Sequence, residues 1–306
     1  MSDDPYRDRQ RMLAQRAMNP AKSNLEHYFD VLTGERAATR EAPQPLFDYS
    51  GSFSAIPPQL VPEPLCGEWL RRGTYTIVYA RAGKGKTAVC SHLVSCMKDR
   101  RDWMTQKTKD PGRVVWVDGD NELWQLQERM AFLGKYPDVE LHHVVNKNLL
   151  LHTGEIESLC EGAGMVVFDN FSALFHLEDA NQAEQWRPFN EFMRRIYSKG
   201  PAVILQQHEG KGEGTSAMGS SAQEWTAHNI IRVSTRDISE KESDKLPSYS
   251  GARCGKIVWQ KHRMSDEPTP MLFATERHQD GSIECNPYPF IDDFNKPRIS
   301  VTGKGY

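Results

Sequence analysis

Short apolar runs and stretches of helical periodicity alternate along the middle of the chain. The apolar runs are rich in β-branched and aromatic residues and predict buried strands at residues 74–80, 113–118, 140–145, 164–170 and 202–207. Between them, apolar residues recur at helical spacing after residue 87, after residue 122 and across residues 183–199. Alternating strands and helices predict an α/β fold, in which a mostly parallel sheet is flanked by helices.

The pattern changes towards the C-terminal end of this region. Three further apolar runs, at residues 228–234, 255–263 and 271–277, follow one another without helical periodicity between them. Strands joined without intervening helices pair antiparallel. These runs therefore predict that antiparallel strands extend the sheet.

The segments on either side of this pattern have a different character. Residues 1–56 mix both charge signs with scattered prolines, and they predict a partly flexible N-terminal arm. A proline-rich stretch at residues 55–65 leads into the main domain, which we assign to residues 57–280. Residues 281–306 are predicted to form a C-terminal tail.

The N-terminal arm contains one helical pattern, near residues 24–33. Ser23 and Glu26 fit a capping box, and Gly34 suits the end of a helix. The apolar stripe of this helix consists of Leu25, Tyr28, Phe29 and Leu32. Because a short helix needs a packing partner, two interpretations stay open: it packs on its own core, or it docks on a neighbouring subunit.

Composition narrows the classes of function. The chain has 306 residues and a net charge of −3, so nucleic-acid binding would depend on local basic patches and not on a general basic field. The six cysteines are scattered without C-x-x-C spacing, which indicates core residues in a reducing compartment and argues against a zinc site. No apolar run reaches membrane-spanning length and the N-terminus is charged. We therefore expect neither a membrane helix nor a signal peptide, and a cytoplasmic protein.

The clearest chemical motif is the stretch YARAGKGKTAV, from Tyr79 to Val89. It follows the pattern G-x-x-x-x-G-K-[ST], except that Ala80 replaces the first glycine; alanine fits there if this position does not need a positive φ. Between a predicted strand and a predicted helix, such a loop binds phosphate through backbone N–H groups and the start of the helix. The predicted nucleotide-binding residues are Ala82, Gly83, Lys84, Gly85, Lys86, Thr87 and Ala88.

Each polar side chain of such a loop has its own function. Lys86 is predicted to reach the β- and γ-phosphates of a nucleotide, and the hydroxyl of Thr87 to hold Mg²⁺. Asp169 ends a buried strand and is predicted to be the second Mg²⁺ anchor, acting through water. The alternative for Asp169 is a carboxylate that caps a helix or a turn.

Acidic residues also follow the strand at residues 113–118. Asp120 is predicted to polarise the attacking water as the general base, with Glu122 as the other candidate. Acidic side chains also favour the N-terminal cap of a helix. We therefore expect at least one of Asp118, Asp120 and Glu122 to cap the helix that follows.

Two later segments complete the candidate site. Gln207 ends a buried strand, where a neutral side chain can sense the γ-phosphate; the alternative is the ordinary polarity of a strand end. The glycine- and serine-rich residues 209–223 are typical of a linker or of a mobile ligand-binding loop. Lys261 and Arg263 lie two residues apart at the end of a late strand, either as a solvated basic edge or as a cation pair for a phosphate.

In this order, these segments resemble RecA-like ATPases of the hexameric replicative helicase class, most like plasmid RepA-type helicases and their phage relatives. The resemblance covers residues 57–276 and rests on ARAGKGKT, VVWVDGDNELWQLQERM, MVVFDN, LQQHEGKGEGTSAMGSSA and KIVWQKHR. The first segment is common to many NTPases. The last two, by their order and spacing, indicate this class.

The resemblance implies a RecA-like P-loop core that binds ATP and Mg²⁺ between subunits of a homo-oligomer, a hexamer in this class. It implies that Arg263 and Lys261 enter the site of the adjacent subunit. It also implies contact with single-stranded DNA through Lys211, Gly212, Ser220 and Ser221. The expected enzyme is a DNA-stimulated ATP hydrolase of the DNA helicase type. Other replication or recombination proteins are expected partners, in a bacterial host and from a plasmid or phage gene.

Three features of the sequence depart from the family pattern. Asp120 stands where the family has Glu, Gln207 and His208 stand where RepA-type relatives have two histidines, and Met218 replaces an arginine of the DNA loop. The shorter acid is expected to weaken activation of water, and the missing arginine leaves Lys211 as the main cation of the loop. Two alternatives therefore stay open: a RecA-like recombination or annealing ATPase on single strands, and a nucleotide-gated assembly protein with little hydrolysis.

Overall fold

The computed structural model describes residues 61–177, 179, 181–210, 217, 221–238, 253–264 and 268–287, excepting the side chains of residues 221 and 223. The predicted helix near residues 24–33 lies outside the described residues, as do Lys211, Gly212 and Ser220. Ser221 begins a short 3₁₀ helix, η6 (Ser221–Trp225).

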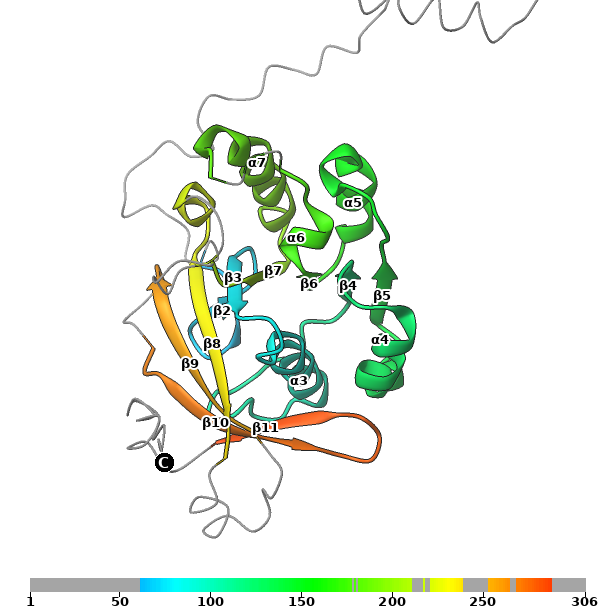
Figure 1. Cartoon of the computed structure of the whole chain (residues 1–306), viewed down its shortest axis with the longest axis vertical. Coiled ribbons are helices and arrows are strands. Elements are labelled where there is room, and N and C mark those ends of the chain that lie inside the picture. Colours follow the sequence, from blue (N-terminus) through cyan, green and yellow to red (C-terminus); the bar gives the residue numbers. More distant parts are fainter. Residues whose placement is uncertain are drawn as a thin grey trace, which may run out of the picture. The chain divides into compact units, whose positions relative to one another are not determined.

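One large sheet organises the described residues. Nine of their strands follow one another in the order β5-β4-β6-β7-β3-β8-β9-β10-β11 (Figure 1). The bounds are β3 Tyr75–Ala80, β4 Val114–Asp118, β5 Val139–His143, β6 Met165–Asp169, β7 Ala202–His208, β8 Asn229–Asp237, β9 Arg253–His262, β10 Met271–Arg277 and β11 Ile283–Pro287. Neighbours from β5 to β8 pair parallel, and those from β8 to β11 pair antiparallel. The predicted α/β fold, with a mostly parallel sheet and antiparallel C-terminal strands, is confirmed.

The strand β8 corrects one detail of the prediction. It pairs parallel with β3, with Thr76 opposite Asn229 and Tyr79 opposite Arg232, and only its other edge pairs antiparallel. Residues 209–228 join the end of β7 to the start of β8. This stretch is long enough for the crossover that parallel strands need. The crossover was not predicted, because residues 209–228 show no helical periodicity.

Helices cover both faces of the sheet (Figure 1). Apolar residues of α3 (Lys86–Asp99) and α4 (Leu123–Met130) pack into one core cluster. Those of α5 (Thr153–Cys160), α6 (Phe171–Leu174) and α7 (Trp186–Tyr197) pack into a second cluster on the opposite face. A small antiparallel pair, β1 (Pro64–Cys66) and β2 (Leu70–Arg71), adds to the first.

The connections of β3 determine where a ligand can bind. All six residues of β3 are buried, because the strand lies near the middle of the sheet with helices on both faces. From β3 the chain passes through α3 to β4, which lies two strands beyond β7 in the sheet. Crevices at the carboxyl ends of parallel strands, where the direction of winding changes, are the usual ligand sites of such sheets.

The C-terminal strand and the cysteines add two findings. β11 pairs with β10, so the sheet continues into the segment that was predicted as a tail.

All six cysteines are buried and carry free thiols, as expected for small core residues. Among the described residues, no helix is long and apolar enough to cross a membrane.

Candidate nucleotide site

The phosphate loop connects β3 to α3, and its backbone explains its sequence. Gly83 has a φ of 69° and Gly85 a φ of 85°, in the left-handed region that favours glycine. Ala80, by contrast, is the last residue of the extended strand β3 and is fully buried. This position therefore needs no positive φ, and alanine replaces the usual glycine without strain.

A cavity of about 370 Å³ opens beside the loop. Six of the seven predicted nucleotide-binding residues line it: Ala82, Gly83, Gly85, Lys86, Thr87 and Ala88. Lys84 does not line the cavity, and its backbone N–H donates to the carbonyl of Arg81 at 3.2 Å. Lys86 is 7% exposed, and burial lowers the pKa of its ammonium group.

Asp169 lies beneath the loop, as predicted for a metal anchor. The hydroxyl of Thr87 donates to its carboxylate at 2.7 Å, and Asp169 is 1% exposed. Its neighbour across the sheet is Asp118, also buried. Burial and the charge of Asp118 raise the pKa of Asp169 to about 7.

A hydroxyl and carboxylates are the hard oxygen ligands that Mg²⁺ prefers. Carboxylates held close together gain from a cation that offsets their repulsion. The residues present therefore fit Mg²⁺ bound together with a nucleotide. Thr87 would hold the ion directly and Asp169 would order its water shell.

Asp118 positions the acidic segment that follows β4. Its carboxylate accepts from the backbone N–H groups of Asp120 and Asn121, at 3.1 and 2.9 Å, and from the Asn121 side chain at 2.9 Å. Asp120 is thereby exposed at the cavity, which it lines. Glu122 is instead the N-cap of α4 and forms a capping box with Gln125. Of the two candidate bases, only Asp120 lines the cavity.

Gln207 was the predicted sensor of the γ-phosphate, but the side chain that lies next to Lys86 is His208. Gln207 is buried in β7 and is not among the described residues that line the cavity, whereas His208 lines it. The Nδ1 atom of His208 lies 3.4 Å from Nζ of Lys86, and its Nε2 lies 3.1 Å from Nδ2 of Asn170. Burial and the charge of Lys86 lower the pKa of His208, which favours the neutral imidazole that can accept from an ammonium group.

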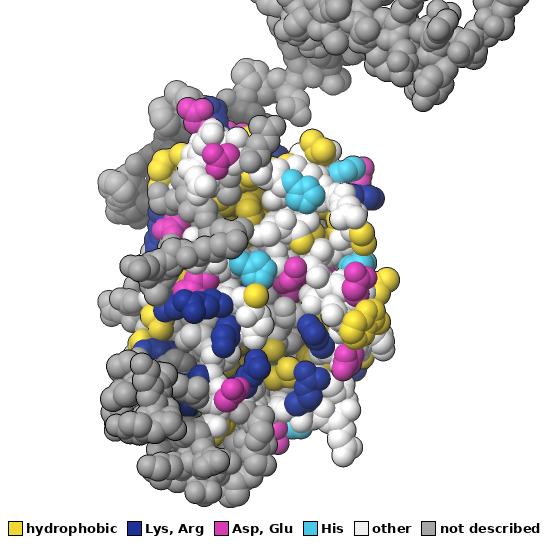
Figure 2. Space-filling view, in the orientation of Figure 1, with side chains coloured by type: hydrophobic (Ala, Val, Ile, Leu, Met, Phe, Trp, Pro, Cys, Tyr) yellow, Lys and Arg dark blue, Asp and Glu magenta, His cyan; other side chains and the backbone are white. Residues whose placement is uncertain are grey.

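Arginines form the outer wall of the cavity, and Figure 2 shows Lys and Arg side chains around α3 on this face. Arg129 lines the cavity from α4 and donates to Asn121 at 3.3 Å. Arg253 donates to the carbonyl of Gly83 at 3.1 Å, and Arg277 also lines the cavity. Arg253 and Arg277 were not predicted from the sequence, because only the antiparallel register brings the start of β9 and the end of β10 to this part of the cavity.

Lys261 and Arg263 lie at the opposite end of the strands from the phosphate loop, which we call the other edge of the sheet. Lys261 pairs with Ile230 near the start of β8, and the backbone of Arg263 donates to the carbonyl of His228. Arg253, at the opposite end of the same strand, is the residue next to the phosphate loop. Lys261 also donates to the backbone carbonyl of Glu224. The two cations therefore cannot reach the cavity of their own chain.

A buried acid connects the phosphate loop to the following loop. Glu209, whose side chain is 4% exposed, accepts from Arg232 at 2.8 Å and lies 3.3 Å from Arg81 of the phosphate loop. Its backbone N–H donates to the carbonyl of Ala80 at 2.9 Å. Glu209 also forms an isolated β-bridge with Ala217. The first residue of the loop at residues 209–223 is thus fixed to the nucleotide site.

These features define the class of the protein. A buried strand, a glycine-rich loop and a helix, with a buried aspartate two strands away, form the nucleotide site of a P-loop ATPase with the RecA-like fold. The chain belongs to the AAA domain family (AAA_25), whose model matches residues 38–214.

Comparison with solved structures supports the same fold. A KaiC-like protein from the hyperthermophilic archaeon Pyrococcus horikoshii OT3 is 14% identical in sequence, with a TM-score of 0.50. The alignment covers 72% of this chain and 91% of that protein. No curated protein sequence matches this chain significantly.

Proposed function

We propose that the protein is an Mg²⁺- and ATP-dependent motor on single-stranded DNA, of the replicative helicase type, and that identical subunits share its sites. The observation that carries this proposal is the separation of two sets of residues. Lys86, Thr87 and Asp120 meet at the cavity, whereas Lys261 and Arg263 lie at the opposite edge of the sheet. If these cations act on a phosphate, it is the phosphate of an adjacent subunit.

The residues around the cavity have distinct functions in hydrolysis. Backbone N–H groups of the loop and the ammonium group of Lys86 bind the phosphates. A bound Mg²⁺ supplies charge neutralisation of the β- and γ-phosphates. Asp120 orients the attacking water and accepts its proton. The partner copy's cations offset the charge that develops in the transition state.

Glu209 supports a link between hydrolysis and nucleic-acid contact. It holds Arg81 in the phosphate loop and begins the loop at residues 209–223. Loss of the γ-phosphate changes the position of the phosphate loop and of His208, which precedes Glu209. The change is transmitted to the loop that we expect to contact DNA.

The test is ATP hydrolysis by the full chain, with and without single-stranded DNA, beside the Lys86→Ala variant. We expect DNA to raise the rate of the native chain and Lys86→Ala to lower it by about 10²-fold or more, because the lysine stabilises the charge of the transition state. Lys107→Ala, a change of an exposed side chain outside the described hollows, serves as a matched control with native rates. Tight ATP binding with negligible turnover under both conditions would instead favour a nucleotide-gated assembly protein.

Strand separation distinguishes the remaining alternative. A helicase separates a forked duplex in an ATP-dependent manner, whereas a recombination or annealing ATPase coats single strands without separating a duplex. DNA-stimulated hydrolysis without strand separation would contradict the helicase assignment and retain the ATPase.

A further inference from the structure

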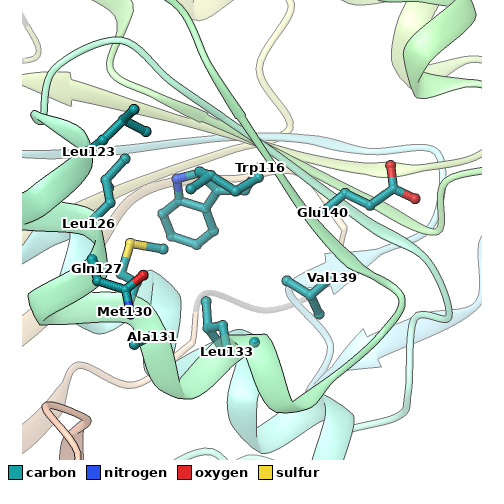
Figure 3. Close-up of a pocket in the computed structure, with 11 residues that line it drawn as sticks. Trp116, Leu123, Leu126, Gln127, Met130, Ala131, Leu133, Val139 and Glu140 are labelled. Carbon is teal, nitrogen blue, oxygen red and sulfur yellow. The ribbon is translucent and has the colours of Figure 1, made fainter.

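The first of two unusual surfaces lies along α4. Leu123 is 58% exposed and Trp124 is 64% exposed. Beside them is a hollow of about 450 Å³ between α4 and the edge strand β5, lined mainly by apolar side chains. Figure 3 shows Trp116 at its base, side chains of α4 on one side and Val139 on the other. Glu140 points away from the hollow and forms an ion pair with Arg113 at 2.7 Å, so the hollow stays apolar.

The second surface lies beside η6. Trp225 is 64% exposed. It borders another hollow, of about 540 Å³, between η6 and α7. Lys261 is fixed next to it through the carbonyl of Glu224. An exposed tryptophan and a hollow thus occur together a second time, at the edge that carries Lys261 and Arg263.

The charges of the two surfaces are complementary. Asp120 and Glu122 are exposed at the start of α4. At the other edge, Arg194 and Arg263 are exposed and Lys261 is half-buried. Three acids, Glu184, Glu191 and Glu224, also border the second hollow or adjoin Trp225, but Glu191 is paired with Arg187 at 2.9 Å. The cations near Trp225, which are Arg187, Arg194, Lys261 and Arg263, still outnumber these acids. Along α4 the acids Asp120, Glu122 and Glu128 outnumber Arg129.

The two surfaces lie on different sides of the molecule. Figure 1 shows α4 at the right and the C-terminal end of β9 at the left. Arg263 directly follows β9 in the sequence. Figure 2 shows hydrophobic side chains exposed over α4 and β5. A contact between two different, complementary patches is heterologous and adds subunits head to tail. Exposed aromatic patches of this kind are typical of protein interfaces.

We propose that the surface around Trp225 packs against the α4 groove of a second copy of this chain. This contact covers both apolar patches and pairs the acids near Asp120 with the cations near Arg263. It also brings Arg263 and Lys261 to the nucleotide cavity of the next subunit, because Asp120 belongs to the segment that precedes α4. The inference rests on the proposed function and names the two surfaces that make the shared site.

The experiment measures the mass of the full chain by light scattering, with Mg²⁺ and a non-hydrolysable ATP analogue. We expect the native chain to assemble, and each of Trp225→Glu and Leu123→Glu to be monomeric. Both changed residues are exposed, and an acid in the first turn of α4 is compatible with the helix, so both variants should fold. Leu151→Glu, which changes a leucine 79% exposed outside both hollows, is the matched control and should assemble.

Mixing the two variants gives a sharper result. Leu123→Glu keeps the Trp225 surface and Trp225→Glu keeps the groove, so one native contact can form between them. The expected product is a one-to-one dimer that grows no further. A monomeric native chain, or native assembly by both variants, overturns the inference. Assembly that depends on both residues while DNA leaves ATP hydrolysis unchanged would instead contradict only the proposed motor function.

Discussion

The burial of the Asp169 carboxylate lowers the stability of the folded chain when no cation is bound. Its pKa of about 7 in the folded chain exceeds the value near 3.9 of an unfolded aspartate. Between these two pH values the folded state binds more protons than the unfolded state. The contribution of Asp169 to the free energy of unfolding therefore falls as the pH rises from about 4 to about 7, and this contribution is then constant above that pH.

The variant Asp169→Asn should remove this cost. Without Mg²⁺ or nucleotide at pH 8, we expect it to be more stable than the native chain by up to about 4 kcal/mol, because each unit of pKa shift is worth about 1.4 kcal/mol. At pH 4 the two chains should differ little. Urea unfolding at both pH values measures the difference. Equal stability at pH 8 would contradict the burial of an unfavourable charge, and the variant should also lose Mg²⁺-dependent hydrolysis.

At the level of single residues, the sequence predicts those members of the site that are fixed by a local motif. Lys86 and Thr87 follow from a loop motif between a strand and a helix, and Asp169 follows from the end of a buried strand; these residues do come together. The neighbouring choice between Gln207 and His208 was not predictable, because the side chains of adjacent strand residues point to opposite faces. Which of them meets Lys86 depends on the register of β7 against β3.

At the level of elements, Glu209 connects the end of β7 to the phosphate loop and β8. We expect Glu209→Gln to keep basal ATP hydrolysis and to lose most of its stimulation by single-stranded DNA, because the ion pairs with Arg81 and Arg232 disappear. A several-fold fall in the ratio of stimulated to basal rate is the expected measurement. Glu63→Gln removes two exposed ion pairs, with Arg72 and Lys109, and should leave the ratio unchanged. A native ratio in Glu209→Gln would exclude Glu209 from the coupling.

The elements also mark where prediction from the sequence ends. The alternation of periodicities predicted the strands and helices around the phosphate loop, because each forms from local patterns. The placement of β8 parallel to β3, and of Arg253 against Gly83, depends on pairing between residues far apart in the sequence. No local pattern encodes this pairing, so the arginine wall of the cavity became visible only in the folded chain.

At the level of the whole molecule, sites shared between subunits allow two inactive variants to complement each other. Lys86→Ala lacks a working cavity but presents Arg263, and Arg263→Ala lacks the cation but has an intact cavity. We expect each alone to lose hydrolysis, with Arg263→Ala about 10³-fold slower if it acts as an arginine finger. Their mixture should recover part of the native rate. No recovery, in a mixture that assembles, would contradict sharing of the site.

The burial of all six cysteines has a practical consequence. Burial also raises the thiol pKa of Cys96 and of Cys160 to about 12, and reaction with maleimides needs an accessible thiolate. A cysteine introduced at the position of the exposed Leu151, outside both hollows, would therefore be the only readily labelled thiol of the described residues. A fluorophore at this position would report the approach of neighbouring subunits in real time, with every native cysteine left in place.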